Sequence, residues 1–479
     1  MRILFLLHRY LGIAGSLVLL LWSLSGIVMM YKQYPQLSDI DQIQLLENLA
    51  FQDCCELKYL TFLARDFSAA SVEMLGDTPL VRLQTTDNEL LSYALRSGVF
   101  INAISEQRAY VLANKLLNDH LAGAKILQLQ SIHSDQWTID SQYHPHRPLY
   151  KFTIDDASRT EFYLSSYNGE LVQLTTKPQR MWGYLGPVVH WVFPRFLREN
   201  SNLWRNLVIF LSVLGIFLTV TGLMVGWKQV KSRGSQITLS RWSPYQGVHF
   251  FHHYLGLIFG LLTLVWVSSG LLSMNPQGLL IASDSKVESL RLQGRDFDIE
   301  ALALVLADAD FQRVAEQYVR VDFSMLDGQL SMVGISDDGS RYSLHRRSYR
   351  PVAVADDLLN RLAEQLQPEF AIASRQLLLA ADNYYYAQHQ SVEFPVYRVI
   401  IDDPQGSRYY LSPVSGQIKL KVDSSTRWYR WLFYAVHRMD FIPLARFSSV
   451  REYFMIVLLV GVVMLCGTGT WLAVRRLLR

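Results

Sequence analysis

The sequence has only three cysteines among its 479 residues, and their positions give no disulfide framework. Cys54 and Cys55 are adjacent in the chain, and Cys466 lies inside a long apolar run. We expect the adjacent pair to be incidental, and a reactive or metal-binding role is the alternative. The cysteines therefore do not indicate the function of this chain.

Motifs for nucleotides are also lacking. The sequence has no Walker A motif, no Gly-x-Gly-x-x-Gly after a predicted strand and no flavin-binding module. The run GTGT at residues 467–470 is expected to be close helix packing by small residues. The net charge of +3 is small for this length, so nothing indicates a nucleic-acid partner.

Half of the residues are apolar, and four uncharged runs are long enough to cross the ~30 Å hydrocarbon core of a bilayer as helices. They cover residues 10–31, 206–227, about 250–274 and 453–474. The first run is too long for a signal peptide and has no small-x-small cleavage site, so we expect it to remain as an anchor. The predicted fold class is an integral membrane α-helical protein with four transmembrane helices.

Positive charge predicts the orientation, because Lys and Arg near helix ends favour the cytoplasmic side. The loop at 229–248 carries Lys231, Arg233 and Arg241 and no acidic residue, and both chain ends are basic. We therefore expect a multi-pass protein of a bacterial inner membrane with both termini in the cytoplasm. The two long segments between the helices then lie outside, in the periplasm.

The chain contains an internal repeat. LHRYLGIAGSLVLLLWSLSGIVMM at residues 7–30 aligns with FHHYLGLIFGLLTLVWVSSGLLSM at 251–274 with a constant offset, 252 − 8 = 244. Residues 150–173 align with 397–420 at an offset of 247, and this register continues through Thr221-Gly222 over Thr468-Gly469. The predicted architecture is a parallel two-fold repeat whose pseudo-twofold axis lies along the membrane normal.

The external segments have strand-like alternation around turns, together with stretches of helical spacing. Each is expected to be a small α+β domain, a helix on an antiparallel sheet, with Asp155-Asp156 and Asp402-Asp403 forming turns. The predicted segments are 1–32 (first helix), 33–204 (first external domain with a helix before the second span), 205–228 (second helix), 229–248 (loop), 249–275 (third helix), 276–452 (second external domain with a helix before the fourth span) and 453–479 (fourth helix and tail).

The repeat separates four of the twelve histidines from the others. His8 aligns with His252, and His190 aligns with His437, since 437 − 190 = 247. His249 aligns with Phe5 and His253 aligns with Arg9, so these two belong to the second half alone, although either remains an alternative to His252. No ligand spacing is visible among the remaining histidines.

Topology then sorts the four histidines into two symmetry-related pairs, one at each membrane face. Two neutral imidazoles from facing helices of an apolar bundle are typical axial ligands of haem iron. We therefore predict two haem b groups, one held by His8 and His252 and one by His190 and His437. The alternative is a polar cluster at the membrane interface, with no ligand bound.

Three arginines close in sequence to these histidines could pair with haem propionates: Arg9, Arg180 and Arg427. Because His190 lies 31 residues before Thr221, about 46 Å of helix, it cannot share one spanning helix with Thr221. It is placed on a short amphipathic helix, about residues 181–197, along the outer surface, and His437 is placed likewise.

The repeated LHRYLGI and FHHYLGL openings, with YRVIIDDPQGSRYYLSPVSGQI, resemble the PepSY-associated transmembrane family (PepSY_TM) over nearly the whole chain. The resemblance implies a four-helix bacterial inner-membrane protein with periplasmic PepSY domains. Some members are haem-containing reductases that release iron from ferric siderophores. Others carry a fused flavin and nicotinamide domain, which is not visible here, so electrons are expected from quinol or a separate cytoplasmic donor.

The expected function is that of an oxidoreductase, an electron conduit that reduces a periplasmic acceptor, with a ferric siderophore as the first candidate. No catalytic residue beyond the haem ligands is predicted. The alternative is a non-enzymatic PepSY membrane protein that binds peptide, protein or siderophore in an accessory or regulatory role.

Overall fold

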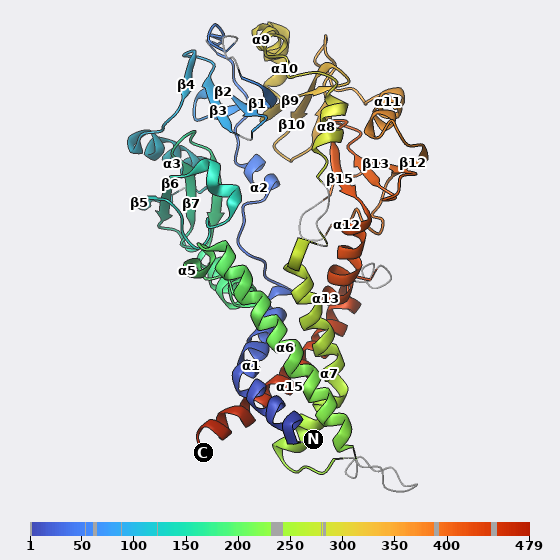
Figure 1. The fold of residues 1–479 in the computed structure, drawn as a ribbon. Helices are drawn as coiled ribbons and strands as arrows, with labels where there is room; N and C mark the ends of the chain where they lie inside the picture. The colour runs from blue at the N-terminus through green and yellow to red at the C-terminus, as the bar shows by residue number, and fades with distance from the viewer. Residues whose placement is uncertain are drawn as a thin grey trace. The chain divides into compact units, whose positions relative to one another are not determined.

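The structure is a computed structural model that describes residues 2–52, 54–60, 65–87, 89–121, 123–230, 243–278, 280, 284–387, 392–441 and 448–479 (Figure 1). Its contacts divide the chain into two compact units. The helical unit comprises Met1–Tyr34, Pro178–Ile281 and Ser425–Arg479, and the sheet unit comprises Pro35–Lys177 and Ala282–Ser424. Most of the loop predicted at 229–248, including Lys231, Arg233 and Arg241, lies outside the described residues.

Four long helices form the helical unit: α1 (Arg2–Met29), α6 (Ser201–Gln229), α7 (Val248–Ser273) and α15 (Ser448–Leu477). All four are long and apolar enough to cross a membrane, which indicates a multi-pass membrane protein. The helices α1 and α7 each pack against both α6 and α15. Both chain ends lie at the same end of this unit (Figure 1).

The four helices begin earlier than the apolar runs do, and His8 and His252 lie in the second turn of α1 and of α7. Polar side chains inside the helices are satisfied locally. Ser212 and Thr219, for example, donate to the carbonyl oxygens four residues earlier, at 2.8 and 2.7 Å. Such bonds let hydroxyl groups sit in an apolar bundle.

A short helical segment precedes α6 and another precedes α15. The first consists of α4 (Lys177–Gly183) and the π-helical turn η2 (Tyr184–Val188), which packs against α1. The second consists of α12 (Ser424–Tyr429), the π-helical turn η5 (Arg430–Ala435) and α13 (Val436–Arg438), and η5 and α13 pack against α7. After His190 and His437 the chain reverses at Val192 and Met439, which have positive φ of 52° and 50°.

The prediction of one helix over residues 181–197 is wrong in its extent. The helix has ended before the reversal at Val192, and the separate short helix α5 (Arg195–Arg198) follows Pro194. Pro187 lacks the N–H that an α-helical turn needs, and the helix widens to a π-turn around it. Part of the corresponding break in the second half, residues 442–447, lies outside the described residues.

The sheet unit contains two four-stranded antiparallel sheets with the same strand order. The first has the order β5-β6-β7-β8 and the second β12-β13-β14-β15. Their strands are β5 (Ile126–Ile132), β6 (Leu149–Ile154), β7 (Glu161–Ser165), β8 (Leu171–Thr175), β12 (Ile372–Leu378), β13 (Val396–Ile401), β14 (Arg408–Leu411) and β15 (Ile418–Val422).

A helix shares a hydrophobic core with each of these sheets, as the sequence predicts. The first is α3 (Glu106–His120) and the second is α11 (Asp356–Leu366). The buried face of α11 consists of Leu359, Leu362, Ala363 and Leu366, the spacing of one side of a helix. The predicted turns are also confirmed, because Asp156 and Asp403 each accept from a backbone N–H four residues later.

A third sheet was not predicted. It has seven strands in the order β11-β10-β9-β1-β2-β3-β4, and its central pair, β1 and β9, comes from the two halves of the chain. These strands run antiparallel, with Val72 opposite Val321. The seven strands are β1 (Phe67–Leu75), β2 (Thr78–Thr85), β3 (Leu90–Ala94), β4 (Val99–Ile101), β9 (Arg320–Leu326), β10 (Gln329–Ile335) and β11 (Arg341–Ser343).

This shared sheet makes the two external segments one unit rather than two separate domains bounded at 33–204 and 276–452. Residues 178–204 and 425–452 belong instead with the membrane helices. The remaining short elements are α2 (Asp39–Gln44), η1 (Ser141–His146), η4 (Pro276–Gly278), α8 (Lys286–Gln293), α9 (Ile299–Ala307) and α10 (Ala309–Ala315).

Candidate functional site

The structure brings together the same histidines that the repeat pairs. The ring centroids of His8 and His252, the first histidine pair, are 6.3 Å apart with an angle of 28° between the planes. Those of His190 and His437, the second histidine pair, are 6.2 Å apart with an angle of 68°. Each pair joins the two halves of the chain across the helical unit.

Both separations match the geometry of two imidazoles that bind one metal ion from opposite sides. A ring nitrogen lies about 1.1 Å from its ring centroid, and a metal–imidazole bond is about 2.0–2.1 Å long. Two such ligands in line therefore have centroids roughly 6.2 Å apart. Aromatic rings in direct contact also have centroids about 4.5–7 Å apart, so the spacing has to be considered together with the tautomer of the rings.

Every hydrogen bond that these four rings make to described residues is made through Nδ1. The partners are the carbonyl oxygen of Leu218 for His8 (3.2 Å), the Thr468 hydroxyl for His252 (3.1 Å), the carbonyl oxygen of Trp22 for His190 (3.0 Å) and that of Trp266 for His437 (3.1 Å). A carbonyl only accepts, so Nδ1 carries the proton and Nε2 keeps its lone pair. This is the tautomer that a metal-binding histidine needs.

The Thr468 hydroxyl acts as an acceptor for the same reason. It donates its own hydrogen to the backbone, where the oxygens of Met464 and Leu465 lie at 2.9 and 2.8 Å. Its lone pair is then free to accept from Nδ1 of His252. In the second histidine pair, the hydroxyls of Ser25 and Ser269 lie 3.2 and 3.0 Å from the corresponding Nδ1 atoms.

A glycine next to each of these hydroxyl residues makes room for the ring. A Cβ built on Gly222 would lie 2.7 Å from Cε1 of His8, and one on Gly469 would lie 3.1 Å from Cε1 of His252. For Gly26 and Gly270 the distance to the histidine Cε1 is 3.5 Å. The sequence predicts helix packing for Thr468-Gly469, within GTGT, and no role for the other aligned dipeptides, although one such dipeptide inside each long helix was the available signal.

A cavity of about 760 Å³ surrounds the first histidine pair, a size that accommodates a cofactor. Its wall is mainly apolar, with Gly12 and Gly256 adding space beside the rings. Arg9 lines this cavity, as predicted, together with three arginines near the C-terminus that the sequence analysis missed: Arg475, Arg476 and Arg479. Arg180 on α4 and Arg427 on α12 are half-buried and do not line it.

The neighbouring histidines are placed differently from His252. Both ring nitrogens of His253 are engaged, with the Ser243 hydroxyl and the carbonyl oxygen of Gly226 each at 2.9 Å. His249 lies against the ring of Tyr245, with centroids 6.4 Å apart. His252 alone of the three faces His8, which agrees with the choice made from the repeat.

Two buried indole groups lack a partner in the described part of the chain. The Nε1 atoms of Trp22 and Trp266 are inaccessible to solvent and have no hydrogen-bond acceptor there. These are the residues whose carbonyl oxygens hold the second histidine pair. Buried N–H donors without acceptors are rare, and a bound group would be an acceptor for them.

Within the described residues no cluster of three or more His, Cys, Asp or Glu side chains could hold a metal ion. Each histidine pair thus offers two ligands only. A metal ion there would need its remaining ligands from a non-protein group, and the four nitrogens of a porphyrin meet that need.

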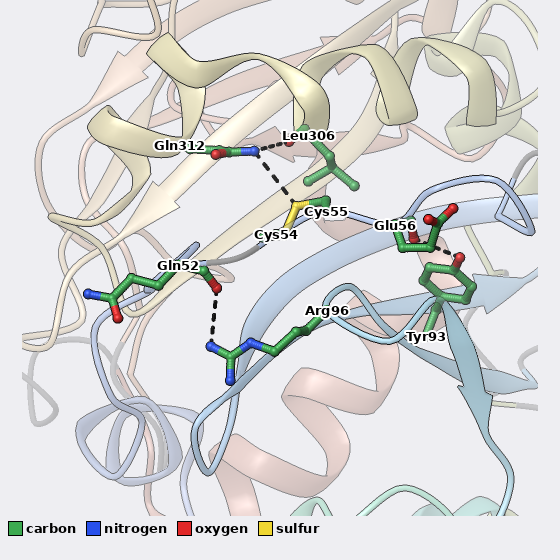
Figure 2. Close-up of a disulfide and its surroundings, with 8 residues drawn as sticks. All are labelled: Gln52, Cys54, Cys55, Glu56, Tyr93, Arg96, Leu306 and Gln312. Carbon is green, nitrogen blue, oxygen red and sulfur yellow. Dashed lines mark hydrogen bonds between the residues drawn. A yellow bond between two sulfur atoms is a disulfide. The ribbon is translucent and has the colours of Figure 1, made fainter.

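Two features of the sheet unit lie outside these pairs. Cys54 and Cys55 are joined in a disulfide between neighbours, and the Gln312 side-chain amide lies 3.7 Å from the Cys55 sulfur (Figure 2). This bond was not predicted, because adjacent cysteines were taken to be an incidental pair.

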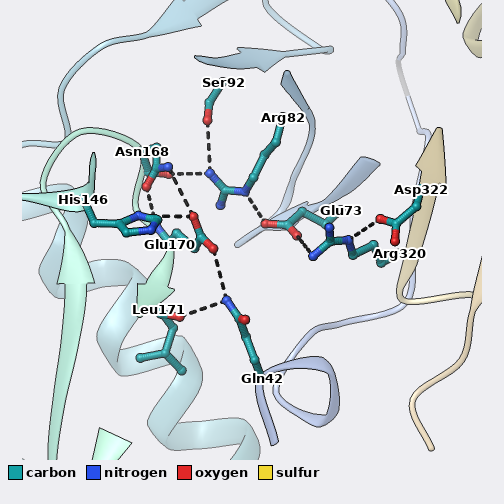
Figure 3. Close-up of polar contacts among 10 residues, drawn as sticks. All are labelled: Gln42, Glu73, Arg82, Ser92, His146, Asn168, Glu170, Leu171, Arg320 and Asp322. Atoms are coloured by element: carbon teal, nitrogen blue, oxygen red, sulfur yellow. Dashed lines mark hydrogen bonds and ion pairs between the residues drawn. The ribbon is translucent and has the colours of Figure 1, made fainter. Parts of the chain in front are cut away.

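A buried ionic network is centred on the three middle strands of the shared sheet, β9, β1 and β2 (Figure 3). Arg82 on β2 bonds to Glu73 on β1 and donates to the Ser92 hydroxyl at 3.0 Å. Arg320 on β9 reaches the other Glu73 oxygen at 4.0 Å. His146 approaches the half-buried Glu170 carboxylate at 3.5 Å. We assign this network a structural role, because it joins strands from both halves of the chain.

In comparisons with known proteins, no family model and no curated protein matches the chain.

Proposed function

We propose that the protein is a di-haem electron-transfer protein of a bacterial inner membrane that reduces a periplasmic acceptor, with a ferric siderophore as the expected acceptor. The observation that carries the proposal is the spacing of the two histidine pairs, 6.3 and 6.2 Å between ring centroids, with all four Nδ1 atoms engaged. His8 and His252 would hold one haem b, and His190 and His437 the other.

The residues around each pair prepare the imidazoles as ligands. Carbonyl oxygens and the Thr468 hydroxyl fix the rings in one orientation and raise the basicity of Nε2. The apolar walls exclude water, which favours neutral imidazole over the charged form. Arg9 would pair with a propionate of the first haem, and the indole N–H groups of Trp22 and Trp266 would donate to the second. Haem iron, when bound, supplies a one-electron redox couple at each site.

Two sites are needed because of the length of the helices. On α1, His8 and Gly26, which faces His190, are separated by 26 − 8 = 18 residues, about 27 Å along a helix. The pairs therefore lie near opposite faces of a ~30 Å hydrocarbon core. A single cofactor would reach only one face.

The direction of transfer rests on the proposed orientation, in which both termini and the first histidine pair are cytoplasmic and the sheet unit is periplasmic. The basic residues at the termini support this orientation. The architecture supports the proposal that the chain is a duplicated PepSY-associated membrane protein. The two four-stranded sheets have one strand order, and both histidine segments end in a residue with positive φ.

The test is an absorption spectrum of the protein purified in mild detergent from haem-replete cells. We expect a Soret band that shifts on reduction with dithionite. The reduced protein should then be reoxidised by a ferric siderophore and not by its gallium(III) complex, which has the same shape but accepts no electron. Colourless protein would contradict the proposal and favour the alternative, a PepSY membrane protein that binds peptide, protein or siderophore without redox chemistry.

A further inference from the structure

The cavity around the first histidine pair has a second polar region that the proposed haem does not use. Tyr245 and His249 both line it, and their rings stack with an angle of 30° between the planes. In the described part of the chain, neither the Tyr245 hydroxyl nor the His249 ring has a hydrogen-bond partner. Two ring-bearing polar groups thus converge on a largely apolar cavity.

The position of the Tyr245 ring is fixed by its contact with His253. The edge of its ring meets the ring of His253, with centroids 5.4 Å apart and an angle of 81°. His253 is buried and is held through both nitrogens by Ser243 and Gly226. This support orients Tyr245 before any ligand binds, which is how a binding group is preorganised.

This region is present on one side of the pseudo-twofold arrangement only. His249 aligns with Phe5 of the first half, which lines the same cavity and has no polar atom in its side chain. Groups that belong to both halves suit a cofactor held symmetrically. A pair of groups found in one half suits a second ligand that binds once per chain.

We propose that Tyr245 and His249 bind the head group of a membrane quinol beside the first histidine pair. A quinol head is a flat ring with two hydroxyl groups, and it fits between an aromatic hydroxyl and an imidazole in an apolar wall. The exposed side chain of Phe251 on α7 and the largely apolar cavity wall suit a ligand that arrives from the bilayer rather than from water.

This inference rests on the proposed function and names its electron donor. Oxidation of a quinol breaks two O–H bonds and gives a quinone, two protons and two electrons. The unpartnered ring nitrogen of His249 accepts one proton, and the second passes to water at the open side of the cavity. The electrons leave one at a time to a one-electron acceptor, the class of group proposed at His8 and His252.

The experiment measures the binding of a short-tailed, water-soluble ubiquinone to the full chain in detergent by isothermal titration calorimetry. Wild-type protein should bind one quinone. The variant His249→Phe, which copies the residue of the first half, and the variant Tyr245→Phe should each weaken binding by about tenfold, the loss of one hydrogen bond to a buried group. Tyr10→Phe is the matched control, because Tyr10 is exposed and lies outside the cavity lining.

The absorption spectrum of each sample separates this inference from the proposed function. Coloured wild-type protein that binds no quinone, or variants that bind it as wild type does, would overturn the quinol site and leave the haem proposal standing. Colourless protein that still binds quinone through His249 would overturn the haem proposal alone.

Discussion

At the scale of single residues, each histidine ring lies against a glycine, and the absence of a side chain there makes room for the ring. A methyl group on Gly222 would displace the His8 ring and one on Gly469 would press on the His252 ring, whereas Gly26 and Gly270 have room for an ordinary contact. The two histidine pairs therefore differ in how tightly they are enclosed. The first pair is the more sensitive to added volume.

The variant Gly222→Ala should lose the haem of the first pair, so that haem content falls from about two per chain towards one. A Cβ 2.7 Å from Cε1 of His8 forces the ring to move, and Ala itself favours a helix over Gly by about 1 kcal/mol. The matched variant Gly26→Ala, with 3.5 Å to His190, should keep both haems. The pyridine haemochrome assay measures this, and equal losses in the two variants would contradict the geometry.

The variants His252→Ala and His253→Ala distinguish a histidine that binds haem iron from a neighbouring histidine that only packs within the helical unit. His253 makes two buried hydrogen bonds and does not face His8, so its removal should lower stability by about 1–3 kcal/mol and leave two haems bound. His252→Ala should remove one haem. The haem content of the two purified proteins checks this, and loss of haem in His253→Ala with retention in His252→Ala would show that the assignment is wrong.

At the scale of elements, the shared seven-stranded sheet is held by buried charges as well as by apolar contacts. The side chains of Arg82 and Glu73 are 8% and 7% exposed, and Arg320 from β9 reaches the same carboxylate. A buried carboxylate that loses its partner is strongly unfavourable. This network therefore ties β1 and β2 to β9 of the other half.

Replacing Arg82 with Met should lower the free energy of unfolding of the sheet unit by about 3–5 kcal/mol, because the buried Glu73 carboxylate is then left with the longer contact to Arg320, at 4.0 Å. Arg65→Met is the matched control. Its pair with Glu89 is 52% and 65% exposed and is worth at most about 1 kcal/mol. Thermal unfolding of the two variants measures the difference, and equal shifts in Tm would contradict the role assigned to the network.

The same network predicts a dependence of stability on pH. Burial lowers the pKa of His146 below its ordinary 6.5, and the positive charge of Arg82 acts in the same direction, whereas Glu170 opposes it. The folded state then binds fewer protons than the unfolded chain just below pH 6.5, so stability is present above that pH and is lost as the pH falls.

We expect the Tm of wild-type protein to fall between pH 7 and pH 5, and the variant His146→Gln to fall less. The remaining decrease near pH 4.5 belongs to carboxylates such as Glu170. Burial alone would raise the pKa of Glu170, but Arg82 and His146 outweigh burial and lower it. Identical pH profiles for the wild type and His146→Gln would show that His146 is not the titrating group.

Some secondary-structure elements could be predicted from local sequence patterns, and others could not. The four membrane helices, the α3 and α11 packings and the Asp156 and Asp403 turns follow from local patterns, and the structure confirms them. The pairing of β1 with β9 could not be predicted, because strands about 250 residues apart find their register through tertiary contacts. The widened turn around Pro187 also depends on packing against α1.

The site was predicted to a similar degree. The repeat paired His8 with His252 and His190 with His437, and these pairs are adjacent in the structure. The sequence alignment matched the hydroxyl residues and glycines that contact the rings, but it could not predict these contacts. They depend on which helices pack together. In the sequence, Arg475, Arg476 and Arg479 indicate only a cytoplasmic C-terminus. That they line the cavity was not predicted.

At the scale of the whole molecule, each histidine pair takes one histidine from each half of the chain. Neither half could complete a proposed haem site alone, so the proposed function needs both halves. The claim that the ligands pair across the two halves is therefore the centre of the proposed function. It is also separable from the identity of the electron acceptor.

The most direct measurement of that claim is the haem content of double variants. His8→Ala with His252→Ala should keep one haem per chain, as should His190→Ala with His437→Ala, because each double variant empties a single site. His8→Ala with His437→Ala should keep none. Loss of both haems in His8→Ala with His252→Ala, or retention of one in His8→Ala with His437→Ala, would contradict the pairing, and wild-type protein without haem would contradict the function.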